Sequence, residues 1–457
     1  MTKKIALFAL VAVGVFCSCS QSSDLVNDLP TPSEKQKVEE KTSISFDTYN
    51  AKSAIVRSSR AGYAGDMTTA MLQKEGFGVI AYYTGSDDYS AWTKEAPNFM
   101  YNTKVSIAGA DGTSPSSDPW TYSPTVYWPN GNATADNVGA AGTGGGKLSF
   151  FAYAPYTAVT PSTGVATGDA TTGIKGLSSN AATTDPTVSY SLDGGVDLLW
   201  GTAGTNGVTV NDAAQAGTTL TGGKAPVNVD LTKMKTNGKV NFLFKHALAR
   251  IGSINVLADI DNDGEATGGT LTDSKIFVNN ITISNGTESE VSTVIGDGSL
   301  NLATGVWTAG SSKQTISKTF SGESLNSAIR VASTTPEAVG TNTWEQIFTT
   351  EGVTPTPTSI FSGSASPIML IPGADQTIRV SISYYVTSKD ANLGRGYTWI
   401  PQSVSKTISL GTLEMNKSYS LTLHLGLNSV KFTASVSDWD NAASSLSVDL
   451  PVNVVGE

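Results

Sequence analysis

The chain has 457 residues, enough for two or three ordinary domains; 15 % of them are charged, 46 are glycine, and the formal net charge is −10. An average soluble domain has about 25 % charged residues, and the Ser, Thr, Asn and Gly that replace them here disfavour long helices and favour short strands joined by turns. The acidic balance, without a basic stripe, excludes the positive face that nucleic-acid binding requires, so we expect no nucleic-acid partner.

Residues 1–18 are predicted to be a bacterial lipoprotein signal peptide. An apolar run from Ile5 to Phe16 is too short for a bilayer span of about 20 residues, but it has the length of a signal-peptide core. Both cysteines of the chain follow at once, and the small Ser18 makes Cys19 the expected lipidated residue. Acyl chains such as palmitate would then hold the protein on a membrane. A plain secretory signal with incidental cysteines is the alternative.

The region after the signal is predicted to be a flexible tether followed by a β-rich domain. Residues 19–42 are polar and show no apolar period. Beyond them the apolar period is mostly two, which indicates half-buried strands. The strands expected here, with one short helix at 66–75, are 44–48, 77–83, 105–107, 126–128, 148–153 and 197–200. A Gly-, Thr- and Ala-rich stretch at 201–225 is expected to end this first β-sandwich domain, 43–225.

Two arginines follow the first predicted strand. Arg57 and Arg60 lie in a small, polar segment in which a trypsin-like protease can cut. Cleavage there would free the strand at 44–48 and leave an unpaired sheet edge. An ordinary surface loop is the alternative interpretation.

A second β-sandwich domain is expected at 226–440, with strands at 240–244, 276–283, 378–386, 405–410, 421–427 and 430–436. The tail after it, 441–457, contains a strictly alternating strand whose apolar residues are Leu446, Val448, Leu450, Val452 and Val454. Pro451 has no N–H and lies on the polar side, which restricts this strand to a sheet edge. Such a strand is suited to donation to another subunit; pairing within its own domain is the alternative.

Few residues are available for chemistry, and we expect neither an enzyme nor a bound cofactor. The sequence contains no nucleophile elbow, and no motif marks a pair of glycosidase carboxylates. His246 is expected to face inward and His424 to lie on the polar side of its strand, both as structural residues. The glycine-rich stretch 142–148 lacks two of the residues that a phosphate-binding loop requires, and it is interpreted as a surface loop.

The best metal candidate is an alternating acidic segment, and it is a weak one. Asp259, Asp261 and Asp263 precede a glycine and can converge on Ca²⁺. Thr270 stands where a calcium loop needs a bidentate Glu. An acidic turn between strands is therefore the preferred interpretation, and no metal site is predicted.

Aromatic residues gather in the first domain, where Trp92, Trp120, Tyr122, Tyr127 and Trp128 alternate with proline-rich segments. Such rings stack on sugars in some proteins, and in others they fill the core. A monomeric, glycan-binding surface lipoprotein is thus the alternative function.

Taken together, these features resemble the fimbrillin family, the type V pilins of Bacteroidales. The segments that carry the resemblance are the lipoprotein signal ending at Cys19, 76–82, 120–124, 127–129, 148–153, 197–200, 240–248 and 416–439.

The resemblance implies two transthyretin-like β-sandwich domains in an outer-membrane lipoprotein that becomes a stalk subunit of a fimbrium. It also implies that an arginine-specific protease removes the anchored N-terminal strand after Arg57 or Arg60. The C-terminal strand of another subunit, here Leu446–Val454, then fills the exposed groove, and the polymer supports adhesion to a host or bacterial surface ligand.

Overall fold

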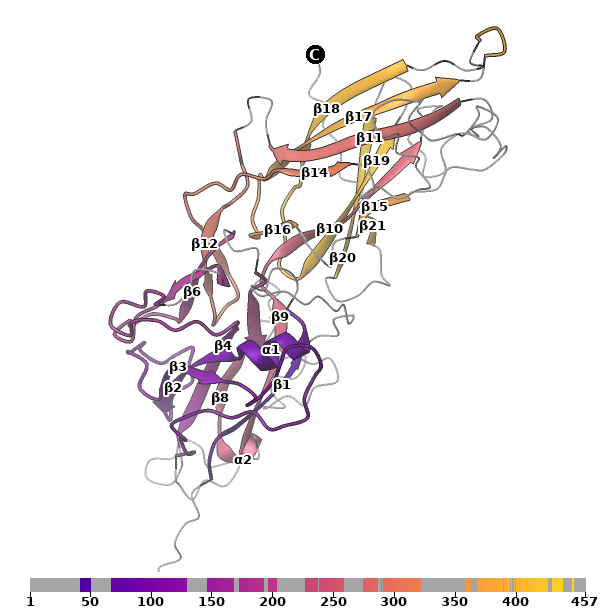
Figure 1. Cartoon of the computed structure of the whole chain (residues 1–457). Coiled ribbons are helices and arrows are strands. Elements are labelled where there is room, and N and C mark those ends of the chain that lie inside the picture. Colours follow the sequence, from indigo (N-terminus) through magenta and orange to yellow (C-terminus); the bar gives the residue numbers. More distant parts are fainter. Residues whose placement is uncertain are drawn as a thin grey trace, which may run out of the picture. The chain divides into compact units, whose positions relative to one another are not determined.

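The computed structural model describes residues 42–50, 67–129, 146–167, 172–192, 196–203, 227–236, 238–258, 274–286, 289, 291–321, 358–362, 368–388, 390–394, 396, 398, 400–425, 430–438 and 446–447. Regular structure in these residues is nearly all β and forms four sheets (Figure 1), which confirms the expected all-β class. Two short helices, α1 (Thr69–Glu75) and α2 (Lys233–Thr236), complete it. In the described part of the chain, no helix has the length and apolar character needed to cross a membrane.

The first sheet has the order β1-β9-β7-β4-β2-β3, with β8 paired to β4. Its strands are β1 (Ser45–Asn50), β2 (Phe77–Gly85), β3 (Met100–Val105), β4 (Lys147–Ala154), β7 (Leu199–Thr202), β8 (Asn228–Leu231) and β9 (Lys239–His246). β8 and β9 follow residue 225, where we placed the boundary between two domains, and both pair within this sheet. The domain boundary itself stays a prediction.

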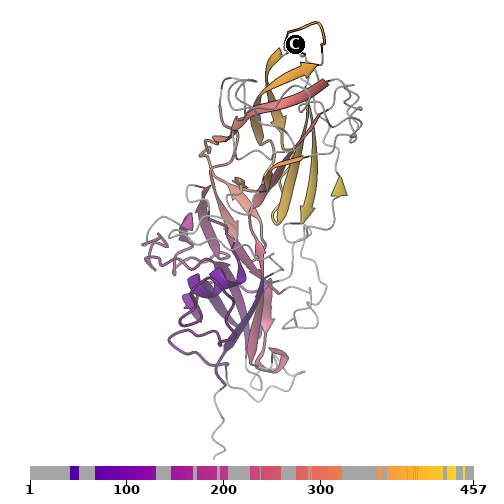
Figure 2. The same ribbon diagram turned by 45° about the vertical axis from the view of Figure 1, so that its right-hand side comes forward.

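Three further sheets follow. One contains β10 (Ala249–Ala258), β15 (Thr358–Ser362), β16 (Ile368–Leu370), β19 (Lys417–Leu425), β20 (Val430–Asp438) and β21 (Leu446–Ser447). The second contains β11 (Ser274–Asn285), β14 (Lys318–Ser321), β17 (Thr377–Ser388) and β18 (Ile400–Ser409). The third joins β5 (Ile174–Leu177) and β6 (Thr187–Ser191) to β12 (Asp297–Asn301) and β13 (Trp307–Ala309). In Figure 2 the yellow strands include β19, which pairs with β10, and β20, which pairs with the other side of β19.

Two tryptophans fix the corner at which β9 leads into β10. The indole N–H of Trp200, on β7, donates to the carbonyl of Leu302 at 2.9 Å. The indole N–H of Trp307 donates to the carbonyl of Ala247 at 2.8 Å. Gly305 has φ of 68° and lies so close to the Trp200 ring that a Cβ would meet it at 2.4 Å, so only glycine fits here. One apolar cluster accordingly runs from Ile80 in the first sheet to Leu425 in β19.

Three local expectations were wrong. The strand expected at 105–107 includes only Val105, where β3 ends, and Ser106 forms an isolated bridge with Thr121. Residues 126–128 form no strand, because only one isolated bridge, Ser43 to Tyr127, pairs them with the start of β1. His424 was expected on a polar face, yet it is 3 % exposed. Its neighbours Leu423 and Leu425 point to the opposite face and are also fully buried, so both faces of β19 are covered at this end. His246 is buried, as expected.

Buried tyrosines make alkaline stability a test of the packing. Burial raises the pKa of Tyr82, Tyr89 and Tyr153 above the ordinary value of 10.0. A tyrosine with a raised pKa contributes stability that is complete below pH 10 and is lost as pH rises toward its folded pKa. Each contributes a slope of about 1.4 kcal/mol per pH unit once the unfolded chain is ionised, so we expect the free energy of unfolding to fall steeply above pH 10.

The test variant is Tyr153→Phe, because Tyr153 is fully buried. Denaturant unfolding between pH 8 and 11.5 should show a slope that is smaller than the parent's by about 1.4 kcal/mol per pH unit. Equal slopes in the two proteins would contradict the burial of the Tyr153 hydroxyl.

Candidate functional site

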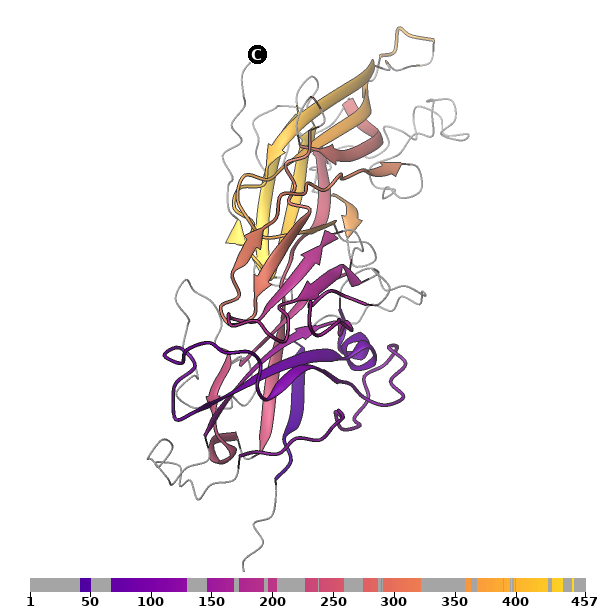
Figure 3. The same cartoon turned by 90° about the vertical axis from the view of Figure 1, so that its left-hand side faces the viewer.

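The strand β1 lies at the edge of the first sheet and pairs with a single neighbour strand, β9. The pairing is parallel and runs from Ser45 opposite Lys239 to Asn50 opposite Phe244. Figure 3 shows the indigo β1 alongside the pink β9. Because an edge strand has a ladder on one side only, its removal breaks one row of hydrogen bonds and leaves the rest of the sheet paired.

Alternate side chains of β1 enter the core. Ile44, just before the strand, is 2 % exposed and Phe46 is 4 % exposed, whereas Ser45 between them is exposed. The Phe46 ring lies in a cage of aromatic rings, with centroid distances of 5.2 Å to Tyr122, 6.1 Å to Phe150 and 6.2 Å to both Phe77 and Phe242. Burial of such a side chain contributes about 1.5–3 kcal/mol. Phe46 therefore ties β1 to β2, β4 and β9 through their aromatic side chains.

The loop from Trp120 to Trp128 braces the start of β1 from the side opposite β9. The amide of Ile44 donates to the carbonyl of Val126, and the amide of Trp128 donates to the carbonyl of Thr42, each at 3.0 Å. The Tyr122 hydroxyl donates to the Ile44 carbonyl at 2.8 Å. Proline-rich sequence in this loop therefore makes one wall of the β1 site.

The aromatic residues that suggested sugar stacking are mostly part of the core. Trp128 is 2 % exposed, and its indole N–H donates to the Gly238 carbonyl at 3.0 Å. Trp120 packs edge-on against Phe77 at 5.1 Å, and Trp92 packs against Tyr82 at 5.7 Å. Only Tyr127 of the set is exposed. These rings do not form an exposed stacking platform.

A buried contact between Asp197 and His246 holds the first described residue after the 51–66 segment. The amide of Met67 donates to Oδ2 of Asp197 at 3.0 Å, and the same oxygen lies 2.5 Å from Nδ1 of His246. Both side chains of the pair are fully buried. Because a buried polar group is costly when it loses a hydrogen-bond partner, this contact favours one position for Met67 and for α1 that follows it. Chain cleavage upstream of Met67 leaves this anchor in place.

Most of the predicted site residues lie outside the described residues. These are Cys19, Arg57, Arg60, Asp259, Asp261, Asp263, Val448, Leu450, Val452 and Val454. Leu446 is in β21, where it pairs with Val436 of β20. Among the residues that the structure does describe, no group of three His, Cys, Asp or Glu side chains could hold a metal ion.

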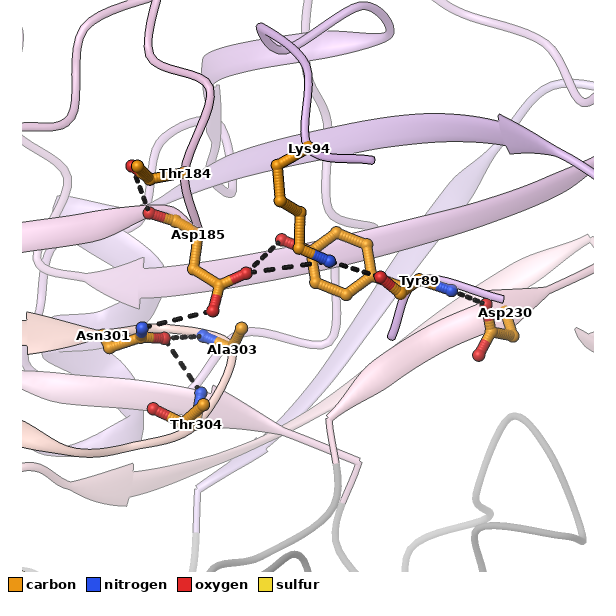
Figure 4. A network of polar contacts seen from close by, with 8 residues as sticks. All are labelled: Tyr89, Lys94, Thr184, Asp185, Asp230, Asn301, Ala303 and Thr304. Carbon is orange, nitrogen blue, oxygen red and sulfur yellow. Dashed lines mark hydrogen bonds and ion pairs between the residues drawn. The ribbon is translucent and has the colours of Figure 1, made fainter. Parts of the chain in front are cut away.

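A polar network that the sequence did not indicate ties the β2–β3 loop to three other segments (Figure 4). Lys94 Nζ lies 3.4 Å from the centroid of the Tyr89 ring and 3.9 Å from Asp185, and it donates to the Tyr89 carbonyl. The Tyr89 hydroxyl donates to Asp185 at 3.0 Å, and the Tyr89 amide donates to Asp230 at 2.7 Å. Asn301 donates to the other Asp185 oxygen at 3.3 Å. The network joins the loops that hold Tyr89, Lys94 and Asp185 to β8 and to the end of β12. No short motif links residues so far apart in sequence.

Comparison with known proteins shows which solved structures have a similar fold. No protein-family model matches the chain. A crystal structure of a fimbrial protein from Bacteroides vulgatus superposes with a TM-score of 0.53 and 21 % identity, covering 87 % of this chain and 99 % of that one. The chain is similar to fimbrial proteins. A fimbrium subunit, Fim1C of Phocaeicola vulgatus, is 27 % identical over 223 residues, and these fimbrial likenesses support the fimbrillin resemblance. The matched part spans 48 % of this chain and 44 % of Fim1C.

Proposed function

We propose that this protein is a structural subunit of a cell-surface fimbrium, without enzymatic activity, that polymerises by donor-strand exchange. The observation that carries the proposal is β1: a strand at a sheet edge whose Phe46 fills an aromatic cage and which precedes two arginines in sequence. The fimbrial relatives support a role in a fimbrium and its association with other fimbrial subunits.

The first stage of the proposed pathway is export and anchoring. Acylation of Cys19 holds the precursor on the outer membrane, and the polar tether 19–42 spaces β1 from the lipid. In this state β1 covers the apolar groove beside β9, so that edge is not available to another chain and the precursor stays monomeric.

The second stage is cleavage by an arginine-specific protease after Arg57 or Arg60. After the cut, β1 is held to the body by non-covalent contacts, chiefly its ladder with β9, the 126–128 brace and the packing of Ile44 and Phe46. Met67 stays bound to Asp197 on the other side of the cut. Release of β1 therefore opens the groove without loosening α1.

The third stage is replacement of β1 by the tail of a second copy. The strand Leu446–Val454 presents five apolar side chains at alternate positions. Their burial contributes on the order of 10 kcal/mol before the cost of ordering the tail is subtracted. Exchange of one short strand for a longer apolar one favours the polymer, which then supports adhesion at the cell surface.

The charge-preserving double variant Arg57→Lys/Arg60→Lys tests the trigger. An arginine-specific protease does not cut after lysine, so we expect full-length lipidated monomer on the cell surface and no polymer. Surface fractions separated on denaturing gels, followed by N-terminal sequencing, measure this directly. The two single variants serve as controls and identify the residue that is cut; polymers of normal length and normal N-terminus from the double variant would refute the trigger.

A further inference from the structure

We propose that the incoming tail strand runs antiparallel to β9, so that it occupies the groove in the opposite direction to the β1 strand it replaces. This inference rests on the proposed function, because it assumes that a second copy's tail enters the groove. It concerns which backbone groups of the tail face β9, and the evidence comes from β1 and from the position of Pro451.

The hydrogen bonds of β1 show which of its residues bond to β9. The amide of Ser45, whose side chain is exposed, donates to the Gly238 carbonyl at 3.2 Å, at the start of β9. The amide of Ile44, whose side chain is buried, points the other way and donates to Val126. Backbone groups alternate along a strand as side chains do. Along β1, therefore, the outward-facing residues bond to β9 and the inward-facing residues point away from it.

Strand direction determines which set bonds to β9. Suppose that a strand is reversed while the same side chains stay inward. The backbone groups that pointed toward one neighbouring strand then point toward the opposite side. A parallel occupant, like β1, bonds to β9 through its outward-facing residues. An antiparallel occupant bonds to β9 through its inward-facing residues, and its outward-facing residues point to the free edge.

The tail carries its proline on the outward-facing side. In the proposed exchanged strand, the alternation places Leu450 and Val452 inward with the other apolar residues and Pro451 between them outward. In a parallel arrangement the missing N–H of Pro451 would leave a carbonyl of β9 without its donor at the centre of the junction. In an antiparallel arrangement every residue that bonds to β9 has an N–H, and Pro451 faces the edge. In the described residues that edge is braced only near Ile44, by 126–128.

The energetics of pairing support the same direction. A parallel ladder is slightly less stable per residue than an antiparallel one. The precursor pairs β1 with β9 in the parallel sense, so exchange for an antiparallel tail replaces the weaker ladder by the stronger. A proline on the free edge also hinders a further strand from adding to the junction.

Crosslinking within polymers tests the direction. Lys239 and Lys245 lie on the outward face near the two ends of β9, six residues or about 20 Å apart, and Asn453 faces outward near the end of the tail. Chains carrying Asn453→Cys with either Lys239→Cys or Lys245→Cys are expressed in full length, and their surface polymers are treated with a short bismaleimide. We expect a covalent ladder with Lys239→Cys and none with Lys245→Cys.

The other outcomes are distinct. A ladder with Lys245→Cys alone would overturn the antiparallel direction and leave donor-strand exchange intact. Polymers without a ladder in either pair would overturn the placement of the tail beside β9. Failure of the parent chain to polymerise would overturn the proposed function itself. As a second measurement, Asn453→Pro should dissociate from polymers at a rate within about twofold of Asn453→Ala, since neither loses a bond to β9; a rate about tenfold higher would indicate the parallel direction.

Discussion

Deletion of residues 445–457 should give a protein that folds, reaches the cell surface and is processed, but forms no polymer. The tail supplies the five apolar side chains of the proposed junction. In the described residues the tail contacts its own fold only where Leu446 and Ser447 pair with β20. The midpoint of thermal unfolding should therefore change little, while polymer on native gels disappears.

Two point variants separate the donor role from general effects on the tail. Leu450→Asp places a charge on the inward side and should weaken assembly about 10- to 100-fold, since it removes about 1.5–3 kcal/mol of burial. Asp449→Ala changes the adjacent, outward-facing residue and should assemble normally. Unaltered polymer from the deletion variant, or equal effects of the two point variants, would remove the tail from the mechanism.

Phe46→Ala should destabilise the precursor strongly and leave the mature polymer unaffected. The Phe46 ring is 4 % exposed within four aromatic rings, and truncation of a buried Phe to Ala typically costs about 3–5 kcal/mol. After cleavage and exchange, however, Phe46 belongs to a fragment that has left the groove. Denaturant unfolding should therefore show a lower free energy of unfolding for the uncleaved variant. The rate at which the polymer of the same variant dissociates should be unchanged.

Asp47→Ala is the matched control, because Asp47 is the next residue of β1 and faces outward. Its carboxylate lies 3.3 Å from Lys239 in an exposed ion pair, which contributes about 0–1 kcal/mol. We expect precursor stability close to that of the parent. If Phe46→Ala weakened the polymer as much as the precursor, β1 would have to remain in the groove after assembly.

Side-chain alternation was sufficient to predict most strands. The period of two identified β1, β9, β19 and β20, whereas β2 and β4 were identified from continuous apolar, β-prone runs that are buried on both faces of the sheet. It could not give the order of strands: the Ser45 hydroxyl meets the Gly238 carbonyl across 193 residues, and no local pattern records that pairing. Alternation also could not predict the burial of His424. This polar residue lies on the polar side of its strand, but it is buried because both faces of the strand are covered.

The candidate site was predictable in part. Parity placed Phe46 inward, as the structure confirms, but the cage around it includes Tyr122 from a loop whose path depends on tertiary contacts. The Lys94–Asp185 contact likewise joins two loops that have no shared motif. Lipidation at Cys19, cleavage at Arg57 or Arg60 and donation of the tail stay predictions, because their residues lie outside those described, apart from Leu446.

The corner at Ala247 has a mechanical consequence for such a filament. Tension that enters a subunit through the strand beside β9 passes along the covalent backbone into β10, which pairs with β19 from Arg250 to Ala258. It leaves through β20 and the tail. Along this route the tension acts parallel to the strands. The hydrogen bonds of each ladder then bear the load at the same time, rather than one after another. A stretched filament should thus break by loss of the exchanged strand before any subunit unfolds.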